Sequence, residues 1–474
     1  MTDYDRLSAL DASFLHLESL ETPMHVGALA VFEGAAFFDP SGRFRLADVR
    51  SLIASRLHQL PKLRRRLMTV PFEQGRPIWV DDERFDISYH VRLTAVPRPG
   101  TRAQLLSLTA RIQSQLLDRT RPLWELWFVE GLQGGQVALV QKTHHAMIDG
   151  VSGVDVATVL LDLSPEVEIL DPPAWIPRPA PSARGLLADT LLERTTEPTE
   201  FVRSVRGLAR APRRAADETA KIVRAVRSLA ADSPLAPKTS FNVPVGRARR
   251  FAGVRIPLGD VATIRREWGG TINDVALAIV AGALRRRLTG RGDELPETMR
   301  VLCPVSVRDD TERMQLGNRI SAVFVEIPIA EPDPHMRLAT IAMRTRELKA
   351  ADQSVAASAL FDLGEYVAPN LLGLAARLVQ HQPFVNLVVT NVPGPPVPLY
   401  CLGARMVEAY PMVPLSRNLS LGVAILSYCD QLHFGLLAGA DAWPDLDALA
   451  ADLEAAAAEL GQTAVPRESG RKAI

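Results

Sequence analysis

Cysteine is scarce in this chain. The three cysteines, Cys303, Cys401 and Cys429, lie far apart and show no CxxC spacing. They therefore indicate neither a disulfide framework nor a zinc site, and a reducing cytoplasm fits best. An excess of charge of one sign is also missing, because Lys plus Arg and Asp plus Glu both number 54. This balance removes the general electrostatic argument for a nucleic-acid partner.

Long apolar runs are absent as well. No stretch approaches the roughly 20 uninterrupted apolar residues that a membrane-spanning helix needs. The N-terminal residues 1–18 carry acidic side chains and lack the basic start and apolar core of a signal peptide. We therefore expect a cytoplasmic protein, with any membrane contact peripheral, at the inner membrane face or on lipid inclusions.

The chain is long enough for two globular domains. It has 474 residues, of which 47% are hydrophobic, and single cores rarely grow beyond about 250–300 residues. The clearest boundary is the proline-rich segment 171–185, which precludes regular structure. We predict a first domain over residues 1–170, a Pro-rich and then Arg-rich helical linker over 171–240, and a second domain over 241–474.

Strand and helix patterns alternate in both halves, which indicates an α/β fold. In the first half, apolar runs at 25–34 and 136–143 predict strands, and helical spacing at 46–67 and 102–118 predicts helices. The second half continues the alternation, with strands predicted at 300–308, 321–329 and 384–392.

The densest chemical signal is THHAMIDGVSG at residues 143–153, directly after a predicted strand. An imidazole can take a proton from an alcohol at neutral pH, and a tight turn, which Gly150 permits, can aim His145 into a cleft. Adjacent histidines alone are more often hydrogen-bonded, half-buried side chains. The preceding strand and the following Asp149–Gly150 pair favour a catalytic role. Asp149 is interpreted as fixing the loop through an arginine, with orientation of the base as the alternative.

Two other chemistries fit this segment less well. Adjacent histidines point in different directions, and no HExxH motif, carboxylate cluster or cysteine pair accompanies them, so no metal site is predicted. Ser152 lies in DGVSGV, one residue short of the GxSxG spacing that exposes a nucleophilic serine. Covalent catalysis through serine is therefore not indicated.

The sequence HHAMIDG matches the HHxxxDG motif and resembles that of the chloramphenicol acetyltransferase-like enzymes. Further blocks, in the same order, make nearly the whole chain similar to the bacterial wax ester synthase/diacylglycerol acyltransferase family. These blocks are LSALDASFLHLESLETPMHVGAL near the start, RPLWELWFVEGL at 121–132, TINDVALAIVAGALRRRL at 271–288, CPVSVR at 303–308, LGNRIS at 316–321 and TNVPGPPVPLYCLGARM at 390–406.

The resemblance implies two chloramphenicol-acetyltransferase-like domains, each a mixed sheet flanked by helices, with a tunnel through their interface. It implies an O-acyltransferase that needs no cofactor and uses fatty acyl-CoA as co-substrate. Diacylglycerol or a long-chain alcohol would be the acceptor. His145 would deprotonate the acceptor hydroxyl for direct attack on the thioester, without an acyl-enzyme.

The same resemblance implies which residues surround His145. His144, Asp149 and Gly150 belong to its motif, and Arg308, in CPVSVR, is our hypothetical partner for Asp149.

Residues of the second half are candidates for binding the oxyanion or positioning the substrate. They match the ND and NVPGP blocks of the family and are Asn273, Asp274, Thr390 and Asn391. Turn formation is the alternative, because Asn is common before Pro-Gly sequences. Residues 122–124 match the family's PLW block. A packing role at a strand edge explains these apolar residues at least as well as contact with the substrate does.

Basic segments offer candidate contacts for CoA and for lipid. The polyanionic head of CoA would suit a locally basic tunnel mouth, for which the arginine runs 64–66, 247–250 and 285–287 are candidates. Most such runs are simply solvated. Residues 201–230 interleave arginines with apolar residues, which suits an anionic bilayer or lipid-droplet surface. A helix that covers the protein's own surface is the equal alternative.

Two other functions stay open at this level. One is a non-catalytic lipid-binding protein of the same fold, against which the intact HHxxxDG motif argues. The other is an acyltransferase that uses a different acyl donor or acceptor.

Overall fold

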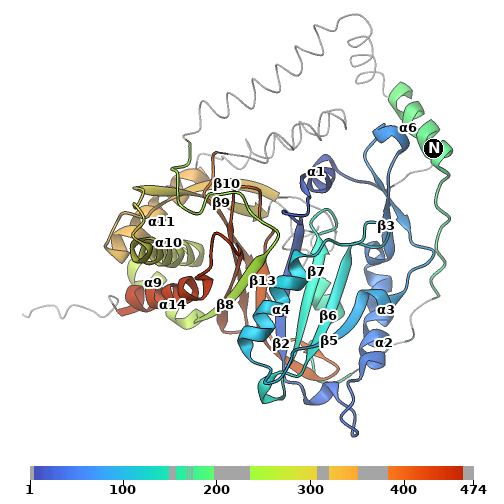
Figure 1. The fold of residues 1–474 in the computed structure, drawn as a ribbon, viewed down its shortest axis with the longest axis horizontal. Helices are drawn as coiled ribbons and strands as arrows, with labels where there is room; N and C mark the ends of the chain where they lie inside the picture. The colour runs from blue at the N-terminus through green and yellow to red at the C-terminus, as the bar shows by residue number, and fades with distance from the viewer. Residues whose placement is uncertain are drawn as a thin grey trace, which may run out of the picture.

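Two six-stranded mixed sheets with flanking helices make up most of the molecule, and a small three-stranded sheet lies beside the first of them (Figure 1). The structure is a computed structural model. It describes residues 5–148, 156–167, 169, 171, 174–196, 235–306, 320–350 and 383–462.

The first sheet has the strand order β12-β13-β2-β7-β6-β5. Its strands are β2 (His25–Phe32), β5 (Val91–Ala95), β6 (Trp124–Glu130), β7 (Val137–His144), β12 (Tyr400–Cys401) and β13 (Ala404–Met412). β5 is parallel to β6, whereas the other neighbours are antiparallel. We predicted that residues 400–412 belong to the second domain, but β12 and β13 complete the first sheet. β13 pairs with β2 and so covers an edge that would otherwise be open.

The second sheet has the order β10-β9-β11-β14-β15-β8. Its strands are β8 (Arg249–Pro257), β9 (Thr298–Ser306), β10 (Ile320–Pro328), β11 (Leu387–Pro393), β14 (Leu421–Tyr428) and β15 (Gln431–Gly439). The small sheet consists of β1 (Asp5–Arg6), β4 (Ile78–Asp81) and β3 (Arg65–Met68).

Helices cover the sheets unequally. The outer face of the second sheet packs against α9 (Leu258–Trp268), α10 (Ile272–Arg291), α11 (Pro334–Ala350) and α14 (Leu446–Gln462). The first half carries α1 (Ala9–Leu17), α2 (Leu46–Arg56), α3 (Ile87–His90), α4 (Arg102–Ser114) and α6 (Ala183–Thr196). Of the described helices, none is long and apolar enough to cross a membrane.

Most predicted elements are confirmed, with one clear exception. The predicted strands of both halves appear within about three residues of their expected ends. The helix predicted over 46–67 is wrong beyond Arg56, because residues 65–68 form β3 instead. Pro61 explains the difference, since its ring clashes with the carbonyl group four residues earlier and disfavours helical geometry at the preceding residue.

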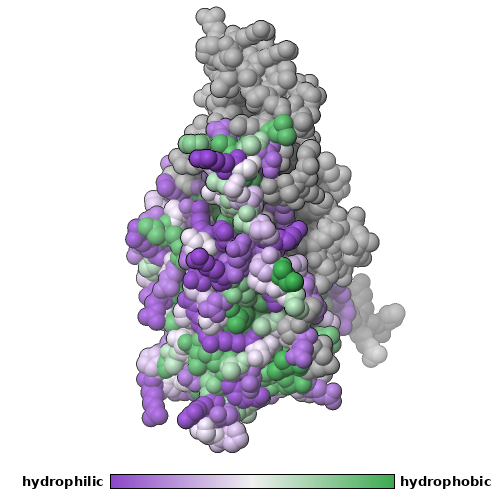
Figure 2. All heavy atoms as spheres, turned by 90° about the vertical axis from the view of Figure 1, so that its right-hand side faces the viewer, coloured by the Kyte–Doolittle hydropathy of each residue, from purple (hydrophilic) through white to green (hydrophobic). Residues whose placement is uncertain are grey.

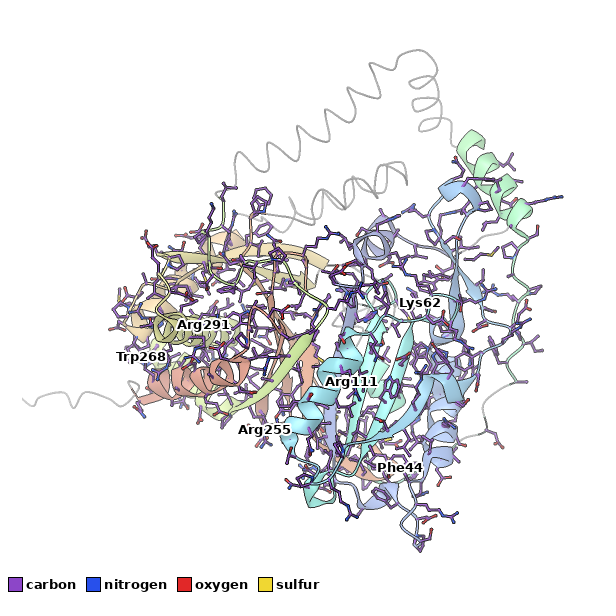
Figure 3. All side chains as sticks on the ribbon, viewed as in Figure 1. Phe44, Lys62, Arg111, Arg255, Trp268 and Arg291 are labelled. Carbon is purple, nitrogen blue, oxygen red and sulfur yellow. The ribbon has the colours of Figure 1, made fainter. Side chains whose placement is uncertain are left out.

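A polar cluster ties the two sheets together where α4 meets β8. Arg102 of α4 donates to the Glu408 carboxylate at 2.8 Å and to the Tyr410 hydroxyl at 2.7 Å, both on β13. Arg255 of β8 lies 3.4 Å from the same carboxylate, and Figure 3 shows it beside α4. These contacts join strands of both sheets, so they help to fix the spacing between them.

Candidate active site

A cavity of about 440 Å³ lies between the first sheet, α1 and the inner face of the second sheet. Most of the described side chains that line it are apolar. The polar ones are Ser13, Gln141, Thr143, His145, Thr390 and Ser416, together with Trp124 and Tyr428. The hydroxyl group of Tyr428 is already bonded, to the Leu399 N–H and the Met406 carbonyl. The cavity therefore suits a hydrocarbon ligand with reacting polar atoms at one place.

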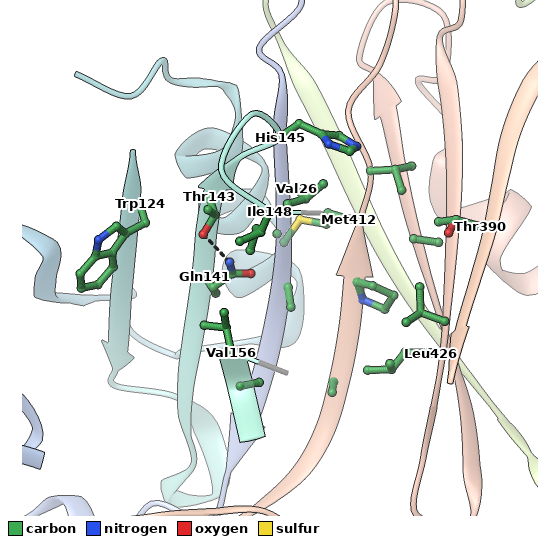
Figure 4. Close-up of a pocket in the computed structure, with 18 of the residues that line it drawn as sticks. Val26, Trp124, Gln141, Thr143, His145, Ile148, Val156, Thr390, Met412 and Leu426 are labelled. Carbon is green, nitrogen blue, oxygen red and sulfur yellow. Dashed lines mark hydrogen bonds between the residues drawn. The ribbon is translucent and has the colours of Figure 1, made fainter. Parts of the chain in front are cut away.

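His145 follows directly after β7 and lines this cavity (Figure 4). Its backbone N–H donates to the Met24 carbonyl at 2.8 Å, and its ring stacks on Phe14 with centroids 4.0 Å apart. Burial raises the pKa of both Cys401 and Tyr428, which also line the cavity, to about 12. Among the described lining residues, His145 is thus the only side chain whose ordinary titration lies near neutral pH.

His144 has a different environment from its neighbour. It is fully buried and does not line the cavity. Its Nδ1 accepts the Ala146 N–H at 3.0 Å, which leaves Nε2 as the protonated nitrogen. Nε2 lies 3.4 Å from Oε1 of Glu18. The structure therefore assigns His144 to holding the loop, and it presents only His145 to the cavity.

Glu18 is the centre of this supporting cluster, and its side chain is only 3% exposed. Its carboxylate lies 3.2 Å from Nε2 of His25 and accepts hydrogen bonds from Arg119 at 2.7 Å and from the Met24 N–H at 3.2 Å. Burial alone would raise the pKa of Glu18, but contacts with His144 and His25 outweigh it and hold this pKa well below its usual range. Glu18 is therefore a buried anion.

Helix α1 brings both supports to the histidine loop. Ser8 caps its N-terminus by accepting the Asp11 N–H, and Glu18 follows its last residue. Phe14 and Glu18 are four residues apart, so they lie on the same side of this helix end. Phe14 contacts the ring of His145, whereas Glu18 contacts His144. One helix thus positions both histidines.

Of the candidates in the second half, only Thr390 lines the cavity. Side chains alternate along β11, so Asn391 points to the opposite face of the sheet. There its Nδ2 lies 3.5 Å from Oδ1 of Asn273, in the first turn of α10. The two asparagines therefore contact each other and not the cavity.

Asp274 caps α10. Its carboxylate accepts the Thr271 N–H and the Thr345 hydroxyl, both at 2.8 Å, while its own N–H donates to the Thr271 hydroxyl. This is a capping box, which satisfies free N–H groups at the helix start. Asp274 is buried outside the cavity, so a direct role for it in binding the oxyanion does not fit the structure.

Comparison with known proteins identifies the family. Residues 7–276 match the wax ester synthase/diacylglycerol acyltransferase catalytic domain, and residues 316–461 match the WS/DGAT C-terminal domain. The chain belongs to the wax ester synthase/diacylglycerol acyltransferase family. The predicted activity class, an acyltransferase, is thereby confirmed.

Relatives and solved structures support this membership along nearly the whole chain. A probable diacylglycerol O-acyltransferase of Mycobacterium tuberculosis is 34% identical over 463 residues, which covers 96% of each chain. The wax ester synthase/diacylglycerol acyltransferase of Marinobacter aquaeolei VT8 has a similar structure, with a TM-score of 0.66, 29% identity and coverage of 97% of this chain and 99% of that one. The starter condensation domain of rhizomide synthetase shares the fold, with a TM-score of 0.57 and 14% identity. The predicted fold of two chloramphenicol-acetyltransferase-like domains is confirmed.

Several candidates of the wax ester synthase/diacylglycerol acyltransferase motifs lie outside the described residues. These candidates are Asp149, Gly150 and Arg308. Because the structure describes neither Asp149 nor Arg308, their pairing stays a prediction. The Arg-rich segment 201–230 also lies outside them. Within the described part of the chain, no group of three or more His, Cys, Asp or Glu side chains is placed to hold a metal ion.

Two of the arginine runs proposed for CoA take part in the fold instead. Arg65 pairs with Asp5 and Asp81 of the small sheet. Arg287 pairs with Asp445 and Asp452 at α14, as its neighbour Arg286 does with Asp452. These ion pairs use the charge of runs 64–66 and 285–287 within the protein, which argues against a CoA site there.

The PLW block, residues 122–124, also contacts the histidine loop. The Leu123 carbonyl accepts the backbone N–H of His144 at 2.9 Å. Trp124 lines the cavity, and its ring N–H donates to the Leu63 carbonyl at 2.7 Å. The block therefore both packs in the core and forms part of the cavity wall.

Proposed function

We propose that this protein transfers a fatty acyl group from acyl-CoA to the hydroxyl of diacylglycerol or of a long-chain alcohol, with His145 as the general base. The observation that carries the proposal is an apolar cavity with this imidazole on its wall. The names of its relatives, a probable diacylglycerol O-acyltransferase and a wax ester synthase/diacylglycerol acyltransferase, support the same substrates.

The proposed reaction is a single displacement at the thioester. His145 takes the proton of the acceptor hydroxyl while its oxygen attacks the thioester carbonyl carbon. The C–S bond of the tetrahedral intermediate then breaks, and His145 returns the proton to the leaving sulfur, so that CoA departs as the free thiol and the imidazole is neutral again. Stacking on Phe14, with ring centroids 4.0 Å apart, holds the plane of the imidazole in the cavity wall.

Thr390 is our proposal for a donor to the tetrahedral intermediate. It lines the cavity from β11, on the side opposite the first sheet (Figure 4). A hydroxyl aimed at the developing oxyanion stabilises the transition state more than the ground state. Asn273 and Asn391 would act only indirectly, by fixing the start of α10 against β11.

An acceptor assay tests the proposed function. Purified protein is incubated with palmitoyl-CoA and either dioleoylglycerol or hexadecanol, thiol release is followed, and the lipids are separated by chromatography. We expect release of CoA that depends on the acceptor and yields one ester per thiol. A protein that forms ester with neither alcohol would contradict the proposal and favour a different acceptor or a non-catalytic role in lipid binding.

We further propose that the protein associates peripherally with anionic lipid through residues 201–230. The face shown in Figure 2 interleaves hydrophilic residues with small groups of hydrophobic ones, which is ordinary for a protein surface and marks no large docking patch. The Arg-rich segment is therefore the stronger candidate, with about 1 kcal/mol per basic residue near an anionic surface.

Flotation with liposomes tests this association. Replacing the arginines of 201–230 by glutamine is expected to lower binding of the full chain to phosphatidylserine vesicles by at least about tenfold. A control variant with glutamine at Arg98, Arg265 and Arg266, which are exposed elsewhere, should bind as the wild type does. Equal binding of both variants would reject the proposal.

A further inference from the structure

Two polar side chains of β7 face the largely apolar cavity. Gln141 and Thr143 both line it, and Figure 4 shows them on the strand that leads to His145. Residues two apart on a strand are separated by about 7 Å, yet the Gln141 amide donates to the Thr143 hydroxyl at 2.6 Å. The amide is therefore turned along the strand towards the histidine end of the cavity.

This pair has hydrogen-bonding groups that the described part of the protein does not use. A glutamine amide offers two N–H groups and a carbonyl oxygen, and a threonine hydroxyl can donate as well as accept. The Nε2–Oγ1 bond is the only hydrogen bond that either side chain makes among the described residues. At least one amide N–H and one hydroxyl O–H of the pair are thus free for a ligand.

Other polar side chains of the first half differ from this pair. The Ser13 hydroxyl donates to the Leu10 carbonyl at 2.7 Å, and the Trp124 ring N–H donates to the Leu63 carbonyl at 2.7 Å. Both residues line the cavity, but both use their donor within the protein. Apart from His145, the described lining residues of the first half therefore offer free donors to a ligand only at the pair.

The position of the pair determines which part of a substrate it meets. At the histidine end, lining residues such as Ser13 are partly exposed, whereas Leu139 and Phe128, further along the sheet than Gln141, are buried. A substrate therefore enters from the histidine end. With its reacting group beside His145, it passes the pair only with the part that reaches inward.

Only one class of substrate carries a suitable polar group on that part. An acyl-CoA is a hydrocarbon beyond its thioester, and its charged nucleotide stays in water because burying charge is unfavourable. A long-chain alcohol is a hydrocarbon beyond its hydroxyl. Diacylglycerol instead carries an ester on the carbon next to the one that bears the hydroxyl, and an ester carbonyl accepts hydrogen bonds.

We propose that Gln141 and Thr143 bind an ester carbonyl of diacylglycerol, which makes diacylglycerol the preferred acceptor over long-chain alcohols. The inference rests on the proposed function, whose acceptor it narrows from two classes to one. A site built to hydrogen-bond a substrate discriminates strongly against an analogue that lacks the bonded group, because the polar groups of the site are then left unpaired.

Removing the carbonyls from the acceptor is the first test. The diether 1,2-di-O-oleylglycerol keeps the hydroxyl and both chains of dioleoylglycerol but has no ester carbonyl. With palmitoyl-CoA as donor, the wild type should show a kcat/KM at least about tenfold higher for the diester than for the diether. In Gln141→Leu this ratio of diester to diether should fall to within about twofold of one.

Matched variants separate recognition from changes in the fold. Gln113→Leu replaces a buried glutamine of α4 that does not line the cavity, so it should leave the ratio of diester to diether unchanged. Thr143→Val removes the hydroxyl and should lower this ratio by about threefold or more, whereas Thr143→Ser keeps the hydroxyl and should preserve the ratio. Thermal melting shows which variants are folded.

Hexadecanol as a third acceptor assigns the pair to the acceptor or to the donor. Equal kcat/KM of the wild type for diester and diether would overturn the proposal, as would an unchanged ratio in folded, active Gln141→Leu. A Gln141→Leu protein whose KM for palmitoyl-CoA rises equally with all three acceptors would also overturn it, because the pair would then bind the donor. Failure of the wild type to acylate any of the three would instead count against the proposed function.

Discussion

Replacing His145 by alanine is expected to lower kcat for acyl transfer by about 10³-fold, since a positioned general base typically contributes 10²–10⁴-fold. The ring lines the cavity, and an imidazole is a group that can accept a proton from an alcohol at neutral pH. Its loss leaves no described lining group of similar basicity, because Cys401 and Tyr428 have a raised pKa. KM for palmitoyl-CoA should change by less than about threefold, since many apolar contacts remain.

Initial rates of thiol release with a saturating acceptor measure this effect, and His335→Ala is its control. His335 lies on α11, where it stacks on Trp268 far from the cavity. Figure 3 shows Trp268 at the outer end of the second half. The control should keep kcat within about twofold of the wild type. A His145→Ala protein that is folded and retains more than a tenth of the wild-type kcat would show that another group removes the proton.

Local patterns in the sequence were sufficient to predict the helices and strands, but not to predict which strands pair with each other. Period-two and helical spacing predicted the strands and helices of both halves, because each depends on neighbouring residues. The position of β12 and β13 in the first sheet depends on pairing between residues 404–412 and 25–32, which are far apart in the chain. Such pairing has no local signature, so the boundary predicted at residue 240 did not anticipate it.

The residues of the candidate site were predictable from local motifs, but the directions in which their side chains point were not. The motif identified His145, and the structure adds that His144 is buried behind it. The capping role of Asp274 was readable from the sequence, since Thr271 and Asp274 have the spacing of a capping box. Alternation along β11 also separates Thr390 from Asn391, but only once it is known which face of the strand meets the cavity.

Glu18 was missed because its partners are distant in sequence. Arg119 lies 101 residues away, and the block that contains Glu18 was used only for its resemblance to the family. One signal was available: Glu18 stands among apolar residues shortly before the predicted strand at 25–34, and a glutamate is rarely buried without a partner. Its four contacts show that the histidine loop is held by charge as well as by packing.

The support for the loop can be removed without touching the base. Glu18→Gln keeps an oxygen for the Met24 N–H but removes the negative charge that faces His144 and Arg119. We expect kcat to fall by about 10- to 100-fold with little change in KM, because a small displacement of a catalytic group is enough for such a loss. Glu21→Gln is the matched control on the same loop, where an exposed carboxylate pairs with Arg247. It should keep full activity.

A double variant distinguishes positioning from a general loss of structure. If Glu18 acts through the histidine loop, adding Glu18→Gln to His145→Ala should lower the remaining rate by less than about twofold, because residues that act as one unit are not additive. If Glu18 only stabilises the fold, the two losses should multiply and follow the fraction of unfolded protein. Thermal melting and kcat of the four proteins in this cycle measure both quantities, and multiplication of the losses in fully folded protein would refute the positioning role.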